Sequence, residues 1–196
     1  MNYTKISEEE IKKELEKTLK PDRFVHSFGT AKCAAELAKK FGLNEEKAYV
    51  AGLLHDCAKC FSKEKLIEII NNKLEVDECE LLNHKTFHAP VSAYIAQKDF
   101  GVEDEEILSA IRRHTLGSLN MTDFEKIIFL ADKIEPETRD KEYATAVKKL
   151  LDEENGLNKA LLMCYKSTIK SLVERELKIC LLTVEIYNCL LSDVSG

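Results

Sequence analysis

Apolar residues recur three or four positions apart along most of the chain, within segments rich in Ala, Leu, Glu and Lys. This spacing gathers apolar side chains on one face and is typical of amphipathic helices that pack around a core. We predict helices over residues 7–19, 23–40, 45–55, 63–72, 77–84, 90–99, 104–113, 122–134, 140–152 and 157–190, the last of them interrupted. The predicted fold class is therefore all-α.

Residues that commonly begin or end helices flank these segments. Ser7 is followed by Glu10 three positions later, which is the pattern of a capping box. Gly42, Gly101 and Gly117 stand where helices are expected to stop. Because no repeat, low-complexity tract or linker rich in Pro, Gly and Ser divides the 196 residues, we expect one domain over the whole chain.

The overall charge narrows the classes of partner. The chain carries a net charge of -6 at pH 7, whereas proteins that bind nucleic-acid polymers usually present a basic surface. We therefore expect no nucleic-acid polymer as partner. A small anionic ligand can still bind where local cations or metals attract it.

The cysteines and the apolar segments bear on the cellular compartment. Seven cysteines occur without regular spacing, and the first residues contain no apolar stretch of the kind found in signal peptides. The most apolar late segment contains Glu185 and Asn188. It is shorter than the roughly 20 apolar residues that span a bilayer. We expect a reduced, cytoplasmic protein without a membrane partner.

Histidines and aspartates in apolar surroundings are the residues most suggestive of chemistry. His55 and Asp56 follow an apolar stretch in LLHDCAK, and Asp132 lies in KIIFLADKIEP, whose apolar repeat demands burial. Three further histidines lie in or beside predicted helix ends, namely His26, His88 and His114. A buried carboxylate is costly unless a cation accompanies it.

This combination of residue types points to metal ions. Imidazoles and carboxylates together suit Fe, Mn, Zn or, with more oxygen ligands, Mg. A single catalytic ion typically takes about three protein ligands, so the six candidates fit two ions better than one. Asp56 is the natural bridge, because each of its two oxygens can take one ion. Spacing alone leaves open a second interpretation, in which the six are hydrogen-bonded structural polar groups.

Two other patterns carry less weight. His84 and His88 are four residues apart, but Pro90 disfavours one continuous helix, and so His84 is left out of the predicted site. Cys57 and Cys60 form a single C-x-x-C without the second pair that a structural zinc site needs. We interpret both as ordinary thiols.

The order of the six candidate residues resembles that of the HD-domain superfamily of metal-dependent phosphohydrolases. Longer stretches look like those of one branch, the YqeK-type symmetrical bis(5'-nucleosyl)-tetraphosphatases. They are RFVHSFGTAKCAAELAKKFGL, EKAYVAGLLHDCAK, HAPVSAYIAQKDFGVEDEEILSAIRRHTLG and MTDFEKIIFLADKIEP. The resemblance covers residues of about 20–140 well and the C-terminal third weakly.

The resemblance implies an HD-domain helical bundle with a buried dinuclear metal site. Residues of about 20–140 would form the HD core and those of about 140–196 a helical extension. The implied activity is the symmetrical cleavage of diadenosine tetraphosphate into two ADP by a metal-activated water. The ligands of one ion would be His26, His55, Asp56 and Asp132. Those of the second ion would be Asp56, His88 and His114.

The same resemblance implies residues that act on the substrate. Asp56 and Lys59 would be catalytic, and Arg23 with Lys59 stands where family members contact the phosphates. Thr115 and Arg139 are further candidates for substrate contacts.

The sequence departs from the family pattern at two places. The arginine that usually follows IEP by two residues is replaced by Thr138, and Arg139 comes next. The late His-Pro pair that is often present is replaced by Ile179-Cys180-Leu181. Both changes concern the nucleoside ends of the substrate and leave the metal core untouched.

The expected cofactors are two divalent metal ions, with iron favoured over Mn, Mg and Zn. The expected partner is a small nucleotide, with an ADP- or GDP-type product, and a homodimer is compatible with this interpretation. Two alternatives stay open. The chain could be an HD phosphohydrolase that acts on a mononucleotide, a deoxynucleoside triphosphate or a cyclic nucleotide, or a non-catalytic regulator that binds metal or nucleotide.

Overall fold

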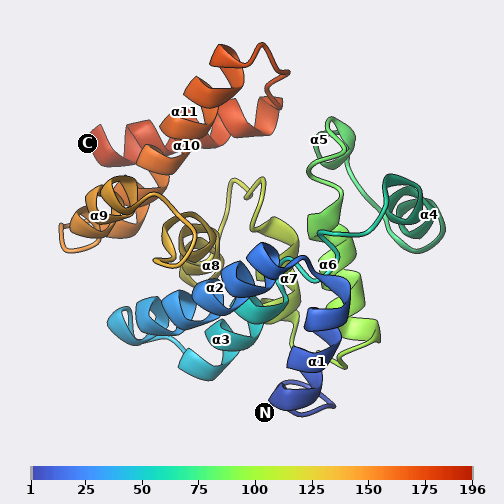
Figure 1. Cartoon of the computed structure of the whole chain (residues 1–196). Helices are drawn as coiled ribbons and strands as arrows, with labels where there is room; N and C mark the ends of the chain where they lie inside the picture. The colour runs from blue at the N-terminus through green and yellow to red at the C-terminus, as the bar shows by residue number, and fades with distance from the viewer. Residues whose placement is uncertain (1, 196) are drawn as a thin grey trace.

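The computed structural model describes residues 2–195, which form helices joined by turns (Figure 1). The helices are α1 (Glu8–Thr18), α2 (Pro21–Lys40), α3 (Glu45–Leu54), α4 (Lys63–Lys73), α5 (Glu78–Leu81), α6 (His88–Lys98), α7 (Glu105–Arg113), α8 (Asp123–Ile134), α9 (Lys141–Leu150), α10 (Gly156–Glu174) and α11 (Leu181–Ser195). No strand occurs among these described residues, and the predicted all-α class is confirmed.

Local sequence explains where most of the helices begin and end. The Ser7 side chain accepts a hydrogen bond from the backbone N–H of Glu10, whose own carboxylate accepts one from Ser7, so the capping box is confirmed. Gly42 and Gly117 follow helices with φ angles of 68° and 78°. Side chains other than glycine rarely adopt this left-handed conformation, which is why α2 stops just before Gly42, whereas Gly117 ends the turn that follows α7.

The boundaries of α5 and α6 differ from the predicted ones. The predicted helix over 77–84 ends at Leu81, because the chain turns between Asn83 and Phe87. The next helix begins at His88, two residues before its predicted start, so Pro90 is its third residue and not its first. The first N–H groups of a helix have no intrahelical partner, and a proline there removes no hydrogen bond.

The central helices place the ends of several elements close together. In Figure 1, α2, α3, α7 and α8 pack against one another, α6 lies along α7, and the α10 and α11 pair lies beyond α8 and α9. Leu53, Ile111 and Ile128 are fully buried in the core between these helices. None of the described helices combines the length and the apolarity needed to cross a bilayer.

A disulfide bridge joins two distant parts of the chain. Cys79 of α5 is bonded to Cys180, which directly precedes α11, and their Cα atoms are 5.7 Å apart. The expectation that all cysteines are reduced is therefore wrong, because spacing along the sequence does not show which thiols the fold brings together. Cys57 and Cys60 are free, as predicted.

The bridge predicts a difference between two cysteine variants. It links residues 101 positions apart, and closing such a loop stabilises a protein by about 2–4 kcal/mol. We expect Cys79→Ala to lower the melting temperature under non-reducing conditions. Cys189→Ala, which removes an exposed free thiol, should leave it unchanged. Thermal unfolding by circular dichroism with and without reductant measures this, and equal melting temperatures for both variants would contradict it.

Candidate metal centre

The structure brings all six predicted metal-ligand candidates into one buried cluster. His26 lies inside α2 and Asp132 inside α8, whereas the other four stand at helix ends. His55 and His114 are the C-cap residues of α3 and α7, and His88 is the first residue of α6. Each of the six is at most 8% exposed.

The donor atoms form two groups that share one carboxylate. His26, His55 and Asp56 form the first group, and Asp56, His88 and His114 form the second. Within each group the donor atoms lie within 4.8 Å of one another. Asp132 adjoins the first group, because its Oδ1 is 2.9 Å from Nε2 of His26 and 3.6 Å from Nε2 of His55. Asp56 thus occupies the central position that a bridging ligand requires.

Three of the histidines are oriented by backbone carbonyls three residues upstream. Nδ1 of His55 is 2.6 Å from the carbonyl oxygen of Gly52. Nδ1 of His114 lies 2.6 Å from the carbonyl oxygen of Ile111, and that of His88 lies 2.8 Å from Lys85. A carbonyl oxygen only accepts hydrogen bonds, so each Nδ1 carries the proton. In the neutral imidazole, Nε2 is then an unprotonated lone pair directed into the cluster.

The Nε2 atoms of the four histidines face one another at short range. Nε2 of His55 is 3.3 Å from Nε2 of His26, and Nε2 of His88 is 3.1 Å from Nε2 of His114. Oδ1 of Asp56 is also buried, without a hydrogen-bond partner of good geometry. Electron-pair donors that converge in this way repel one another unless a cation lies between them. The donor set therefore fits divalent metal ions.

Burial and neighbouring charges shift the pKa values of the clustered residues. Burial alone would raise the pKa of Asp56, but His55, His114, His88 and Lys59 outweigh it and hold this pKa well below its usual value. Burial lowers the pKa of His114 to about 4, which leaves the imidazole neutral at pH 7. Burial opposes the charged form of His55, but Asp56 and Asp132 outweigh burial and raise the pKa of this imidazole. Metal ligands must be ionised carboxylates and neutral imidazoles, so a metal ion at the first group displaces the proton that His55 otherwise holds.

Three of the predicted substrate contacts lie at the edge of the cluster. Nζ of Lys59 is 3.0 Å from Nε2 of His88, and burial lowers the pKa of this lysine. A guanidinium nitrogen of Arg23 is 3.6 Å from Oδ2 of Asp56. The hydroxyl of Thr115 is 3.0 Å from Nε2 of His114.

The fourth predicted contact, Arg139, lies beside the first group. Its Nε donates to the backbone carbonyl of Asp132 over 2.6 Å, and its Nη2 lies 2.5 Å from Oδ1 of the same residue. Thus Arg139 delivers positive charge to this region although Thr138 occupies the usual arginine position. All four predicted contacts surround the cluster of donors.

Sequence reasoning missed contacts that Lys133, Glu135 and Thr138 make with the cluster. Nζ of Lys133 is 2.8 Å from Oδ2 of Asp132. Oε1 of Glu135 is 3.0 Å from Nδ1 of His26. Lys133 and Glu135 follow Asp132 in the quoted segment, yet lysine and glutamate near the end of a helix give no signal by themselves. His84, which was left out, lies in the turn between α5 and α6 and belongs to neither group.

A family comparison agrees with this geometry. Residues 23–137 match the family described as HD domain. The chain belongs to the HD-domain family. A symmetrical bis(5'-nucleosyl)-tetraphosphatase of Bacillus subtilis is 41% identical over 172 residues, which cover 87% of this chain and 90% of that protein. The protein of the same name from Halalkalibacterium halodurans is 36% identical over 171 residues, with coverage of 87% and 90%.

A solved structure shares the fold of this HD-domain chain. It is described as the crystal structure of a predicted HD superfamily hydrolase involved in NAD metabolism from Clostridium acetobutylicum. The two chains are 38% identical with a TM-score of 0.88, and the match covers 96% of this chain and 98% of the other. The likeness therefore extends beyond the segment matched by the HD family.

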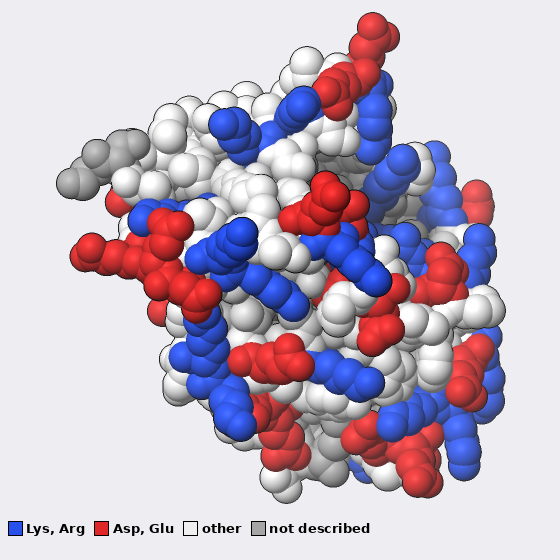
Figure 2. Space-filling view, turned by 60° about the vertical axis from the view of Figure 1, so that its left-hand side comes forward, with Lys and Arg blue, Asp and Glu red and all other residues white. Residues whose placement is uncertain are grey.

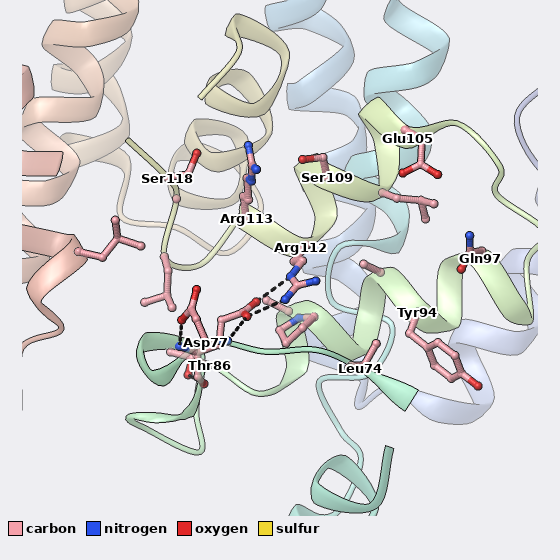
Figure 3. A pocket seen from close by; sticks show the side chains of 18 of the residues that line it. Leu74, Asp77, Thr86, Tyr94, Gln97, Glu105, Ser109, Arg112, Arg113 and Ser118 are labelled. Carbon is pink, nitrogen blue, oxygen red and sulfur yellow. Dashed lines mark hydrogen bonds and ion pairs between the residues drawn. The ribbon is translucent and has the colours of Figure 1, made fainter. Parts of the chain in front are cut away.

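A separate cavity of about 650 Å³ is lined mainly by residues of α6 and α7 (Figure 3). Its lining includes Arg112, Arg113 and Tyr94, but none of the predicted ligands or substrate contacts. Both arginines are already neutralised, since Arg112 pairs with Glu80 at 2.7 Å and Arg113 with Glu125 at 2.8 Å. The metal centre, and not this cavity, is the candidate functional site.

The shared carboxylate predicts the metal content of two variants. We expect Asp56→Ala to lower the occupancy of both ions, because this residue belongs to both groups. His84→Ala should retain the full metal content, since His84 lies outside them. Elemental analysis of anaerobically purified protein provides the measurement. If His84→Ala lost as much metal as Asp56→Ala, the ligand assignment would be wrong.

Proposed function

We propose that this HD-domain chain hydrolyses dinucleoside tetraphosphates symmetrically and cleaves diadenosine tetraphosphate into two ADP. The observation that carries the proposal is the pair of donor groups joined at Asp56, which provides for two cations side by side. Relatives named for this activity are up to 41% identical to the chain over 87% of its length. The rest of the proposal assigns roles to the residues around that centre.

The HD family uses divalent metal, and the two donor groups could hold two ions. We assign one ion to His26, His55, Asp56 and Asp132. We assign the second to Asp56, His88 and His114. Bound divalent ions supply a nucleophile from water at neutral pH and offset charge on phosphoryl oxygens. We propose iron as the natural metal, as the family resemblance implies. The excess of imidazoles over carboxylates is compatible with iron and speaks against Mg.

The cationic side chains at the edge of the cluster would hold the polyphosphate. Lys59 and Arg23 both lie 3.6 Å from carboxylate oxygens of Asp56, so they flank the shared ligand. Fixed positive charge there stabilises the charge that develops when a phosphoanhydride breaks. Arg139 and Thr115 would orient the phosphates from either end of the cluster.

The distribution of surface charge suits a small polyanion better than a polymer. On the face shown in Figure 2, acidic and basic side chains are interspersed, in keeping with the net charge of -6. Attraction of a tetraphosphate would therefore be local to the metal centre.

We also propose that the chain is one domain and acts in the cytoplasm.

The alternative functions differ from the proposed one in what happens to diadenosine tetraphosphate. A mononucleotide or cyclic-nucleotide hydrolase would leave diadenosine tetraphosphate intact, and a non-catalytic regulator would bind nucleotide without turnover. The complete donor set argues against a regulator that binds nucleotide alone, since such a domain has no need of metal ligands.

Analysis of the first products tests the proposed cleavage. With diadenosine tetraphosphate and iron-loaded protein, we expect ADP as the only early product, because the paired cations would lie at the middle of the phosphate chain. Anion-exchange chromatography separates the nucleotides. ATP with AMP would show asymmetric cleavage and refute the proposal, whereas rapid hydrolysis of a mononucleotide alone would favour the alternative.

The role of Lys59 can be tested with a matched lysine variant. We expect Lys59→Ala to lower kcat/KM by on the order of 10–1000-fold while the metal content stays unchanged, since the lysine stabilises charge in the transition state. Lys63→Ala, which removes an exposed lysine at the start of α4, should behave like the wild type. Equal kinetics in the two variants would exclude Lys59 from the mechanism.

A further inference from the structure

Glu135 places a fully buried carboxylate directly behind one of the four imidazoles. It is 0% exposed, and its Oε1 lies 3.0 Å from Nδ1 of His26. The same carboxylate accepts hydrogen bonds from the backbone N–H of Glu137 at 2.7 Å and of Thr138 at 3.0 Å. The Thr138 hydroxyl contacts both Glu135 and Nδ1 of His26.

The position of His26 within its helix explains why it needs a distant partner. The other three histidines stand at helix ends or next to a turn, where backbone carbonyls are free to accept from Nδ1. His26 lies well inside α2, where the carbonyls upstream already accept hydrogen bonds from the helix. Glu135, which is 109 residues away in sequence, takes the place of the missing carbonyl.

A glycine on α2 makes room for this carboxylate. A Cβ atom on Gly29 would lie 2.3 Å from Oε2 of Glu135, which is too close, and 3.1 Å from its Cδ, which is a tight contact. Gly29 is in the interior of a helix, where glycine is a poor helix former. Its presence there is explained by the approach of Glu135 and not by the helix itself.

We propose that Glu135 is a positioning residue for the metal centre. It accepts the Nδ1 proton of His26 and holds Nε2 toward Asp132 and His55. It is also the only charged group among the four Nδ1 acceptors, so it makes His26 a stronger electron donor than the carbonyl-anchored histidines. The inference rests on the proposed metal centre and adds that its two donor groups are unequal, because only the first has a buried carboxylate behind a ligand.

A purely structural role for Glu135 would give different experimental results. Glu135 also closes the turn after α8 through its hydrogen bonds to Glu137 and Thr138. If this were its only role, removing the carboxylate would lower stability without changing the protonation of His26. The tautomer of His26 in metal-free protein therefore separates the two roles.

The first experiment measures that tautomer by nitrogen-15 NMR of the imidazole rings in metal-free protein. In the wild type we expect Nδ1 of His26 to be protonated, whether or not Nε2, which lies 2.9 Å from Oδ1 of Asp132, also carries a proton. In Glu135→Ala/Thr138→Val, which removes both acceptors, we expect a substantial fraction with the proton on Nε2. Thr138→Val alone keeps the carboxylate and should resemble the wild type. His55, His88 and His114 serve as internal controls and should stay unchanged.

The second experiment measures metal binding by titration with ferrous iron under anaerobic conditions. We expect Glu135→Ala/Thr138→Val to weaken binding at the first group by about 10–100-fold and to leave the second group unaffected. Glu135→Gln, which keeps an acceptor without the charge, should fall between the variant and the wild type. At an iron concentration that fills the second group but not the weakened first group, the double variant should hold about one ion per chain.

Gly29→Ala tests the same role while the carboxylate stays in the protein. Alanine favours the helix, so this variant should fold, and its Cβ displaces the carboxylate of Glu135. We expect weaker iron binding at the first group, as in the double variant. This variant decides the question if the double variant does not fold.

The proposal is overturned if His26 keeps its proton on Nδ1 and iron binds with wild-type affinity in both Gly29→Ala and the double variant. Glu135 would then only close the turn. Neither measurement uses diadenosine tetraphosphate, so a protein that binds iron but does not cleave this nucleotide would refute the proposed function and leave the role of Glu135 supported.

Discussion

The organisation of the site depends on one constraint, which is that four imidazoles must present unprotonated Nε2 atoms to the same small volume. Three rings meet this constraint by donating their Nδ1 protons outward to backbone carbonyls, and His26 would do so to Glu135. The carboxylates of Asp56 and Asp132 lie among these imidazoles. Cationic side chains therefore gather on the same side of the molecule, with Arg23 and Lys59 beside Asp56 and Lys133 and Arg139 beside Asp132.

The ends of two helices, α3 and α7, meet the same requirement. α3 and α7 stop at His55 and His114, so the last carbonyls of each helix are free to orient the histidine that ends it. The neighbouring cations Arg23 and Lys59 bring positive charge to a protein whose overall charge is negative. Recognition of an anionic substrate can therefore be concentrated at one site without a basic surface.

Local signals in the sequence allowed the helices and the six clustered residues to be predicted, because caps, apolar periodicity and buried His and Asp are visible one segment at a time. Glu135 could not be found in this way, since its role depends on a contact with His26, 109 residues away. The pairing of Cys79 with Cys180 could not be predicted for the same reason, because neither thiol has a distinctive neighbour in sequence. The start of α6 at His88 was misplaced because Pro90 is equally acceptable as the first or the third residue of a helix.

The disulfide has a consequence for the connectivity of the chain. It makes residues 79–180 a closed covalent ring, which contains His88, His114 and Asp132. His26, His55 and Asp56 lie on the N-terminal arm outside the ring. Each donor group therefore combines atoms from the ring with atoms from the arm, through Asp132 in one and through Asp56 in the other. Ions held there would fasten the arm to the ring, so that the N-terminal helices could not detach while both ions remained bound.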